Sequence, residues 1–276
     1  MRHVAAQTRP VAGMDIGSLS TETVVLQGDR VLGSSLLPTG ADPRRAAERS
    51  LEAALEKAGL CRSHLAMLVA TGYGRVSAPR ADERVTEITC HARGARRLLP
   101  GVGTVIDIGG QDSKVIRLDP SGRVADFVMN DRCAAGTGRF LEVMARALEV
   151  PLEELGSLGL SAPRGLPISS LCTVFAESEV VSLLAQGHPR PEIIRGLHES
   201  IAQRIQGMAE RVGLAPPVLM SGGVANNRGV VEALKARLRV DIAVPPEPQM
   251  VGALGAALLA AEMAEERGSG GGGRTR

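Results

Sequence analysis

The sequence predicts an α/β fold made of two similar halves that enclose a cleft. Short apolar strands alternate with amphipathic helices along most of the chain. Three strands, a helix, a strand and a helix precede residue 100, and this order begins again after Gly103. The motif MDIGS at residues 14–18 recurs as IDIGG at residues 106–110, which is 92 residues later. An internal duplication explains this pattern and places one acidic strand and turn on each wall of the cleft.

The first half is predicted to open with a small meander of three strands. A helix then starts at Asp42 and Pro43, has apolar residues at helical spacing, and stops at Gly59. The remaining expected elements are strands at 11–16, 22–26, 30–37 and 65–70, and a helix at about 83–99.

The second half is expected to follow the same plan with additional helices. Its predicted elements are a strand at 104–108 with a following hairpin, helices at 137–149, 173–186 and 191–212, a strand at 218–220, a helix at 227–238, a strand at 240–244 and a helix at 251–265. We expect the halves to comprise residues 1–100 and 101–267, followed by a flexible basic tail at 268–276.

Composition excludes several classes of function. The 276 residues carry a formal net charge of +2, and they include three Phe, one Tyr and no Trp. Polyanion binding and base stacking on single-stranded nucleic acid are therefore not expected. The N-terminal residues MRHVAAQTRP lack the apolar stretch of a secretory leader, so none is expected. No apolar run is long enough to span a bilayer, and we expect a cytoplasmic protein without membrane association. Its four cysteines should be thiols or metal ligands there.

Three glycine-containing turns are suited to a nucleotide. A strand that carries an acid into a Gly/Ser turn offers backbone N–H groups to phosphate and a carboxylate to hydrated Mg²⁺. One such turn alone is common in ordinary β-turns, but three in this order are more specific. The candidate residues are Asp15, Gly17, Ser18 and Ser20 in the first turn, Asp107, Gly109, Gly110, Gln111 and Asp112 in the second, and Gly222, Gly223 and Asn226 in the third.

Two cysteines stand just before predicted helices. Cys133 precedes the helix at 137–149 and Cys172 precedes the helix at 173–186. A helix N-terminus favours a thiolate, although a single buried cysteine is usually only a small apolar residue. Two thiols are too few for a site with four cysteine ligands, whereas a symmetric dimer supplies four.

The three turns resemble the phosphate and adenosine motifs of the actin, sugar kinase and heat-shock chaperone ATPase superfamily. That resemblance implies duplicated ribonuclease-H-like halves around a nucleotide cleft. The sequence more closely resembles the ATPase activators of 2-hydroxyacyl-CoA dehydratases and the related ATPase subunits of benzoyl-CoA reductase. The matching segments are DIGGQDSK at 107–114, NDRCAAGTGRFLEVMA at 130–145, CTVFAESE at 172–179, SGGVANN at 221–227 and PQMVGALGAALLA at 248–260.

The family resemblance implies an iron-sulfur protein driven by ATP. One 4Fe-4S cluster is expected to bridge a homodimer through Cys133 and Cys172 of both subunits, and the protein should pass an electron from ferredoxin or flavodoxin to an acyl-CoA dehydratase or aryl-CoA reductase. Asp15, Asp107 and Gln111, with Asp112, are expected to organise Mg²⁺ and water for ATP hydrolysis, while Gly222, Gly223 and Asn226 border the adenosine.

Some features leave alternatives open. Glu22 stands where the family often has a lysine, which puts nucleotide affinity in question. Cys61 and Cys90 are expected to serve packing or interfaces, and His91 to be a hydrogen-bonded structural histidine. A small-molecule kinase of amino-sugar type and an actin-like assembly protein are the competing functions. The sequence decides neither the acyl-CoA substrate of the partner nor whether the dimer is homomeric or heteromeric.

Overall fold

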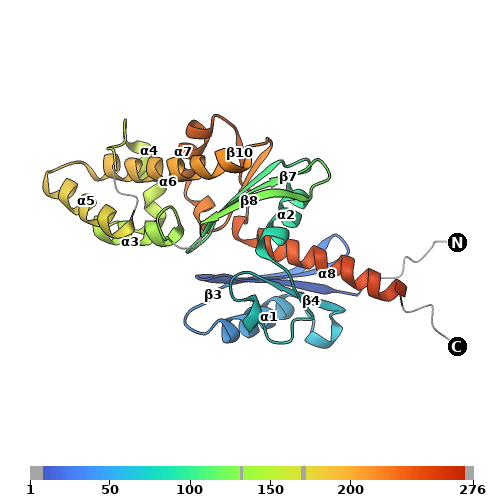
Figure 1. Ribbon diagram of the computed structural model, residues 1–276. Helices are drawn as coiled ribbons and strands as arrows, with labels where there is room; N and C mark the ends of the chain where they lie inside the picture. The colour runs from blue at the N-terminus through green and yellow to red at the C-terminus, as the bar shows by residue number, and fades with distance from the viewer. Residues whose placement is uncertain (1–8, 131–132, 169–171, 271–276) are drawn as a thin grey trace, which may run out of the picture. The chain divides into compact units, whose positions relative to one another are not determined.

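The chain folds into two compact units, each built around a five-stranded sheet (Figure 1). The computed structural model describes residues 9–130, 133–168 and 172–270. Unit 1 comprises the residues up to Leu98 and those from Gln249 onward, and unit 2 comprises Leu99–Pro248. The expected boundaries placed residues 249–267 in the second half, whereas their contacts group them with unit 1.

Unit 1 contains the first sheet, whose strand order is β3-β2-β1-β4-β5. Strand β1 runs antiparallel to β2 and parallel to β4. The helix expected from residue 83 starts later, because residues 83–84 pair with β4 as a short parallel strand. The elements are β1 (Val11–Ile16), β2 (Ser20–Gln27), β3 (Arg30–Pro38), α1 (Pro43–Ala58), η1 (Arg62–His64), β4 (Met67–Thr71), η2 (Arg75–Ser77), β5 (Glu83–Arg84) and α2 (Glu87–Leu98).

Helices cover both faces of this sheet. Helix α1 begins at the predicted place, where the Asp42 side chain accepts a hydrogen bond from the backbone N–H of Arg45, and it ends at Gly59 with a φ of 67°. It packs on the face that carries Met14 and Ile16. The opposite face is covered by α8 (Val251–Gly270), which follows η5 (Pro248–Met250) and packs on Val11, Val24 and Val69. Helix α2 packs against α8.

Helix α8 is longer than predicted. Its expected end was near residue 265, but the helix continues to Gly270, so the beginning of the predicted tail is helical. Residues 271–276 of that tail lie outside the described residues. No helix in the described ranges is long and apolar enough to cross a membrane.

Unit 2 contains the second sheet, whose strand order is β10-β9-β6-β7-β8. The strand expected at 240–244 pairs over only two residues. The strands are β6 (Thr104–Ile108), β7 (Ser113–Leu118), β8 (Val124–Asn130), β9 (Val218–Ser221) and β10 (Ile242–Ala243).

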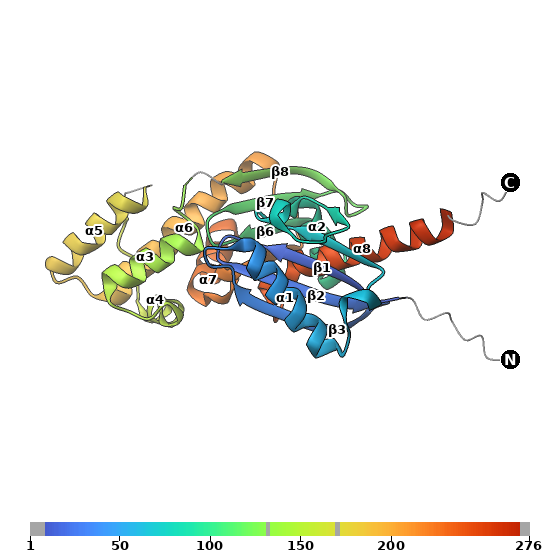
Figure 2. The ribbon, with the colours of Figure 1, turned by 90° about the horizontal axis from the view of Figure 1, so that it is seen from below.

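The helices of unit 2 pack on one face of its sheet and on each other. Apolar residues of α3, α6 and α7 meet Ile106, Ile108 and Met220 in one continuous core, and Figure 2 shows α3, α4, α5 and α6 together at one end of this unit. Helix α4 was not predicted. The helices are α3 (Gly138–Leu148), η3 (Leu152–Glu154), α4 (Leu155–Ser161), α5 (Thr173–Ala185), α6 (Arg190–Val212), η4 (Gly223–Asn226) and α7 (Arg228–Leu238).

The two sheets confirm the predicted duplication. In each unit the first strand lies between its antiparallel hairpin partner and a later parallel strand: β1 lies between β2 and β4, and β6 lies between β7 and β9. Two glycines with positive φ, Gly72 and Gly222, follow the equivalent strands β4 and β9. The predicted duplicated α/β fold is therefore present.

Candidate functional site

Each sheet carries a row of three polar residues at the end of its central strand. In unit 1, Asp15 on β1 is paired in register with Glu22 on β2 and with Thr71 on β4. In unit 2, Asp107 on β6 is paired with Lys114 on β7 and with Ser221 on β9. Residues paired in this way project from the same face of a sheet. The duplication thus places Glu22 and Lys114 at equivalent positions.

The first predicted phosphate turn connects β1 to β2. The backbone N–H of Gly17 donates to the carbonyl of Ser20 across the turn, with N and O 2.9 Å apart. The Thr39 hydroxyl donates to the carbonyl of Gly17 at 2.8 Å. A Cβ at position 17 would lie 2.8 Å from the carbonyl oxygen of Ser20, so the turn requires glycine there. Ser18 and Ser20 are half-buried in this turn.

Two glycines surround the carboxylate of Asp15. A Cβ at Gly72 would lie 2.3 Å from its Oδ1, and a Cβ at Gly252 would lie 1.9 Å from its Oδ2. The Nε2 atom of His91 lies 3.7 Å from the same Oδ2. Asp15 is only 8% exposed. Segments far apart in the sequence therefore shape the surroundings of this carboxylate.

Cys90, which neighbours His91 on α2, is a core residue as expected. Its side chain is fully buried, and burial raises the pKa of its thiol to about 12, with the charge of Asp15 adding to the effect. This thiol stays protonated at neutral pH.

The carboxylate of Asp107 is held by charged and polar partners. Lys114 Nζ lies 3.2 Å from Asp107 Oδ2 and 2.9 Å from Asp112 Oδ2. The Ser221 hydroxyl donates to Asp107 Oδ1 at 2.8 Å. Asp107 and Lys114 are 3% and 4% exposed. Both oxygens of Asp107 are thus engaged, and its orientation is fixed.

The second and third predicted turns both lie in unit 2. The backbone N–H of Gly109 donates to the carbonyl of Asp112 at 3.0 Å, which repeats the bond between Gly17 and Ser20. A Cβ at Gly222 would lie 3.0 Å from Asp107 Oδ1, so the start of the third turn is adjacent to the second. The remaining predicted residues of these turns are the half-buried Gly110 and the exposed Gln111, Gly223 and Asn226.

The second predicted phosphate turn is hydrogen-bonded directly to the start of helix α3. The backbone N–H of Gly138 donates to the carbonyl of Gly109 at 2.9 Å, and that of Arg139 donates to the carbonyl of Gly110 at 2.8 Å. The Ser113 hydroxyl donates to the carbonyl of Gly136 at 2.9 Å. These bonds satisfy N–H groups at the helix start and couple the turn to the segment that carries Cys133.

The two candidate metal-ligating cysteines occupy different settings. Cys172 is the exposed N-cap residue of α5, as predicted. Cys133 is half-buried against the core of unit 2 and precedes Thr137, the N-cap of α3, by four residues, so it does not lie at the helix terminus itself. Within the described residues no group of three or more His, Cys, Asp or Glu side chains could hold a metal ion.

Several residues that surround Asp15 and Asp107 were not among the site residues predicted from the sequence. They include Lys114, His91, Gly72 and Gly252. Lys114 lies within the quoted segment 107–114, and the 92-residue repeat pairs it with Glu22. Gly252 also lies within a quoted segment, 248–260, but nothing in the sequence next to Gly252 or His91 indicates a contact with Asp15, because only tertiary packing brings them there. Cys61 is exposed rather than packed in the core.

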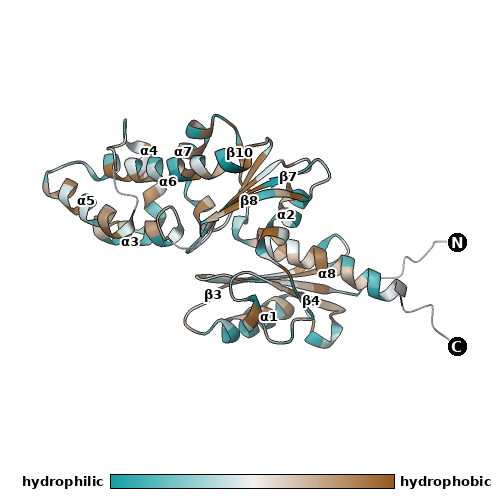
Figure 3. Cartoon of the chain, in the orientation of Figure 1, coloured by the Kyte–Doolittle hydropathy of each residue, from teal (hydrophilic) through white to brown (hydrophobic). Residues whose placement is uncertain are grey.

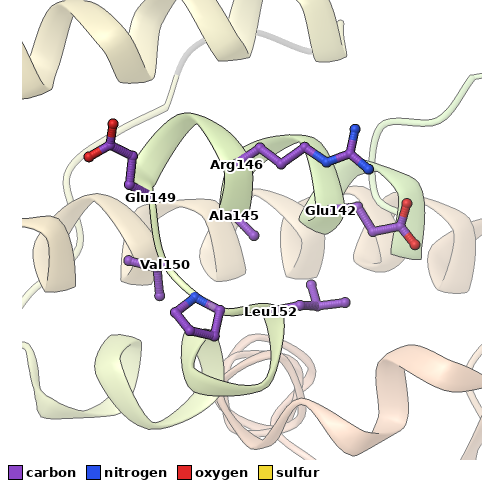
Figure 4. Close-up of a pocket in the computed structure, with 7 residues that line it drawn as sticks. Glu142, Ala145, Arg146, Glu149, Val150 and Leu152 are labelled. Carbon is purple, nitrogen blue, oxygen red and sulfur yellow. The ribbon is translucent and has the colours of Figure 1, made fainter.

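A surface hollow beside the end of α3 contains none of the candidate residues. Figure 4 shows its lining, in which Glu142, Arg146 and Glu149 present charged groups around Val150 and Leu152. It carries no part of the site described above.

The sequence matches known proteins over nearly its whole length. Residues 12–260 match the model of the BadF/BadG/BcrA/BcrD ATPase family. The chain is 49% identical to the activator of lactoyl-CoA dehydratase of Anaerotignum propionicum, covering 92% of this chain and 98% of the relative. It is 34% identical to a subunit of the benzoyl-CoA reductase of Thauera aromatica, covering 91% and 92%.

Solved structures support the same assignment. The activator of 2-hydroxyisocaproyl-CoA dehydratase from Clostridium difficile with bound ADPNP superposes with a TM-score of 0.90 at 43% identity, covering 97% of this chain and 100% of that one. A ROK family glucokinase from Streptomyces griseus shares the fold with a TM-score of 0.58 at 17% identity, covering 92% and 99%. The chain belongs to the BadF/BadG/BcrA/BcrD ATPase family, within which it is similar to activators of 2-hydroxyacyl-CoA dehydratases.

Proposed function

We propose that the protein is an ATP-hydrolysing iron-sulfur activator that delivers a low-potential electron to a 2-hydroxyacyl-CoA dehydratase or benzoyl-CoA reductase type of enzyme. The observation that carries this proposal is the pair of hydrogen bonds from Gly138 and Arg139 to the carbonyls of Gly109 and Gly110. Through them a change at the phosphate turn reaches α3 and the segment of Cys133. A coupling between nucleotide and cluster requires such a link.

The phosphate turns of both units contribute to binding ATP. Backbone N–H groups of the Gly17 and Gly109 turns approach phosphate oxygens, while Ser18, Ser20 and Gly110 line the same turns. Asp15 and Asp107 orient the attacking water, assisted by Gln111 and Asp112, and Gly222, Gly223 and Asn226 border the adenosine. Bound Mg²⁺ would be held through water by the two aspartates and would offset phosphate charge.

The residues fit a cluster shared between two chains. Cys133 and Cys172 supply two thiolates per chain, and a second copy of the chain supplies the other two. A 4Fe-4S cluster, when bound, supplies one-electron redox chemistry. Helix α5, which begins after Cys172, exposes Val174, Phe175 and Val181, and Figure 3 shows brown segments along it. Exposed apolar side chains next to the thiol support a homodimer contact there.

The partners follow from the names of the relatives. Those relatives are activators of acyl-CoA dehydratases and a benzoyl-CoA reductase subunit, which supports a catalytic component of this type as the proposed electron acceptor. Ferredoxin or flavodoxin is the electron donor, because both carry single electrons at low potential.

Metal analysis tests the cluster directly. After anaerobic purification we expect four iron and four sulfide per two chains, as one 4Fe-4S cluster. The cluster should be lost in Cys133→Ser and Cys172→Ser and kept in the matched controls Cys61→Ser and Cys90→Ser. A monomer without iron after anaerobic reconstitution would contradict the electron-transfer function.

Kinetic measurements distinguish an activator from the two competing functions, a small-molecule kinase and an actin-like assembly protein. The activator should hydrolyse ATP without a small-molecule acceptor, and hydrolysis should accelerate when the catalytic partner is added. ATP consumption that requires a sugar, in a protein without a cluster, would instead identify a kinase. Nucleotide-dependent filaments without a cluster would identify an assembly protein.

A further inference from the structure

The central aspartates of the two sheets, Asp15 and Asp107, have different neighbours on the adjacent hairpin strand. Asp107 is paired with Lys114, whose ammonium lies 3.2 Å from Asp107 Oδ2. At the equivalent position unit 1 has Glu22, which is 4% exposed and is paired in register with Asp15. The position on β2 that corresponds to the lysine of unit 2 therefore holds a carboxyl group in place of a cation.

A ring nitrogen from helix α2 reaches Asp15 instead. His91 Nε2 lies 3.7 Å from Asp15 Oδ2, and His91 is 5% exposed. The imidazole can present an N–H group from this nitrogen, as the ammonium of Lys114 does to Asp107. At 3.7 Å the contact is longer than a hydrogen bond, and such contacts at active sites often shorten when substrate binds.

Close helix packing creates the space that His91 and Asp15 share. A Cβ at Gly94 would lie 2.1 Å from the carbonyl oxygen of Val251, and one at Gly255 would lie 1.8 Å from that of Cys90. Helices α2 and α8 therefore meet backbone to backbone. A Cβ at Gly252 would lie 1.9 Å from Asp15 Oδ2 and 3.0 Å from His91 Nε2. Position 252 has to be glycine for the carboxylate and the ring to meet.

We propose that His91 is a positioning residue that fixes the carboxylate of Asp15, as Lys114 fixes that of Asp107, in the space left open by Gly252. The inference rests on the proposed role of Asp15 in ATP hydrolysis. In this proposal His91 acts through Asp15 and is not itself a catalytic residue. Its effect is on the geometry of Asp15, and it should therefore alter turnover more than ATP binding.

The test compares His91→Leu, which removes the N–H donor, with His91→Gln, which keeps one. The measurements on the full chain are kcat and KM for ATP hydrolysis, together with the melting temperature. We expect kcat to fall about tenfold or more in His91→Leu, with KM changing less than about threefold, and His91→Gln to keep at least about a third of kcat. Gly252→Ala should behave like His91→Leu, because the added methyl group displaces the carboxylate.

Cys90→Ala is the matched control, because it loosens the packing of the same turn of α2 without touching the predicted donor. It should lower the melting temperature and leave kcat unchanged. An unchanged kcat in His91→Leu overturns the proposal. An equal loss of kcat in His91→Leu and His91→Gln also overturns the proposal, because the N–H donor would then make no difference. A loss of the same size in Cys90→Ala does so too, because it would show that only the packing of α2 matters.

The variant Asp15→Asn separates this inference from the proposed function. A normal rate of hydrolysis in Asp15→Asn overturns the role of Asp15 itself. An inactive Asp15→Asn beside a fully active His91→Leu overturns only the positioning role of His91.

Discussion

Glu22 and Lys114 occupy equivalent places in the duplicated sheets, but one side chain is acidic and the other is basic. Each is buried beside an aspartate proposed to act on ATP. Lys114 places an amino group between Asp107 and Asp112, whereas Glu22 places a second carboxyl group beside Asp15. Since like charges in a poorly solvated site repel each other, the two turns present different electrostatic environments to a polyphosphate.

Replacing Glu22 with Gln should tighten nucleotide binding. The substitution keeps the shape of the side chain and removes an ionisable carboxyl group near the first predicted phosphate turn. We expect the Kd for Mg-ATP to fall about threefold or more, because less repulsion remains between protein and phosphate. Isothermal titration calorimetry measures this directly, and an unchanged or higher Kd would show that Glu22 does not weaken ATP binding.

Replacing Lys114 with Met should damage both stability and activity. Methionine has a similar volume but leaves Asp107 and Asp112 without the ammonium that lies within 3.2 Å of both. Removing one partner of a buried ionic group typically costs about 3–5 kcal/mol. Urea denaturation gives the free energy of unfolding. The exposed lysine of a surface pair, in Lys235→Met, is the control and should cost less than about 1 kcal/mol; equal losses in the two variants would contradict the role assigned to Lys114.

Helix α6 carries a second buried histidine that makes unit 2 sensitive to acid. His198 is 2% exposed and faces Gly159 of α4 and Gly229 of α7, where a Cβ would come within 2.7 and 2.4 Å of its ring. Burial lowers the pKa of His198 from 6.5 to about 4. Between these values the unfolded chain binds a proton that the folded chain does not, so stability is lost as the pH falls through this window.

The cluster-free chain should therefore lose on the order of 3 kcal/mol of unfolding free energy between about pH 6.5 and pH 4 through this group. Urea denaturation across that range checks the prediction. His198→Gln, which does not titrate, should show a shallower pH dependence, and identical slopes for the two proteins would rule out His198 as the cause.

The elements that could be predicted from the sequence are those with a local signal. The apolar strands at 11–16 and 104–108, and helix α1 between Asp42 and Gly59, lie where hydrophobic patterning and capping place them. Strand β5 was missed because it has only two residues and depends on pairing with β4. The glycine turns follow the strands at the predicted places, whereas the contact of His91 with Asp15 was not predicted, because it arises from packing between α2, α8 and β1.

At the scale of the whole molecule, the proposed activity should depend on contacts between two copies of the chain. The two candidate ligand thiols, Cys133 and Cys172, and the exposed apolar side chains of α5 support the proposed dimer. A carboxylate placed in an apolar interface is costly to desolvate, so association should respond to a single charge there.

Phe175→Asp should weaken dimerisation at least about tenfold, which corresponds to about 1.4 kcal/mol. Phe175 is 67% exposed in the single chain. The control is Val76→Asp in unit 1, whose side chain is 74% exposed and lies outside α5. Analytical ultracentrifugation under anaerobic conditions compares the variants. Dimers of equal strength in Phe175→Asp and Val76→Asp would place the interface elsewhere.

The return of α8 to unit 1 has a consequence for biosynthesis. Unit 2 is one continuous segment, Leu99–Pro248, whereas unit 1 needs residues from Gln249 onward to cover the sheet face that carries Asp15. A ribosome releases the chain from its N-terminus, and domains fold as units when their sequence is available. The half that is translated first is therefore completed last, and a nascent chain ending before Gln249 lacks Gly252 and the helix that closes over Asp15.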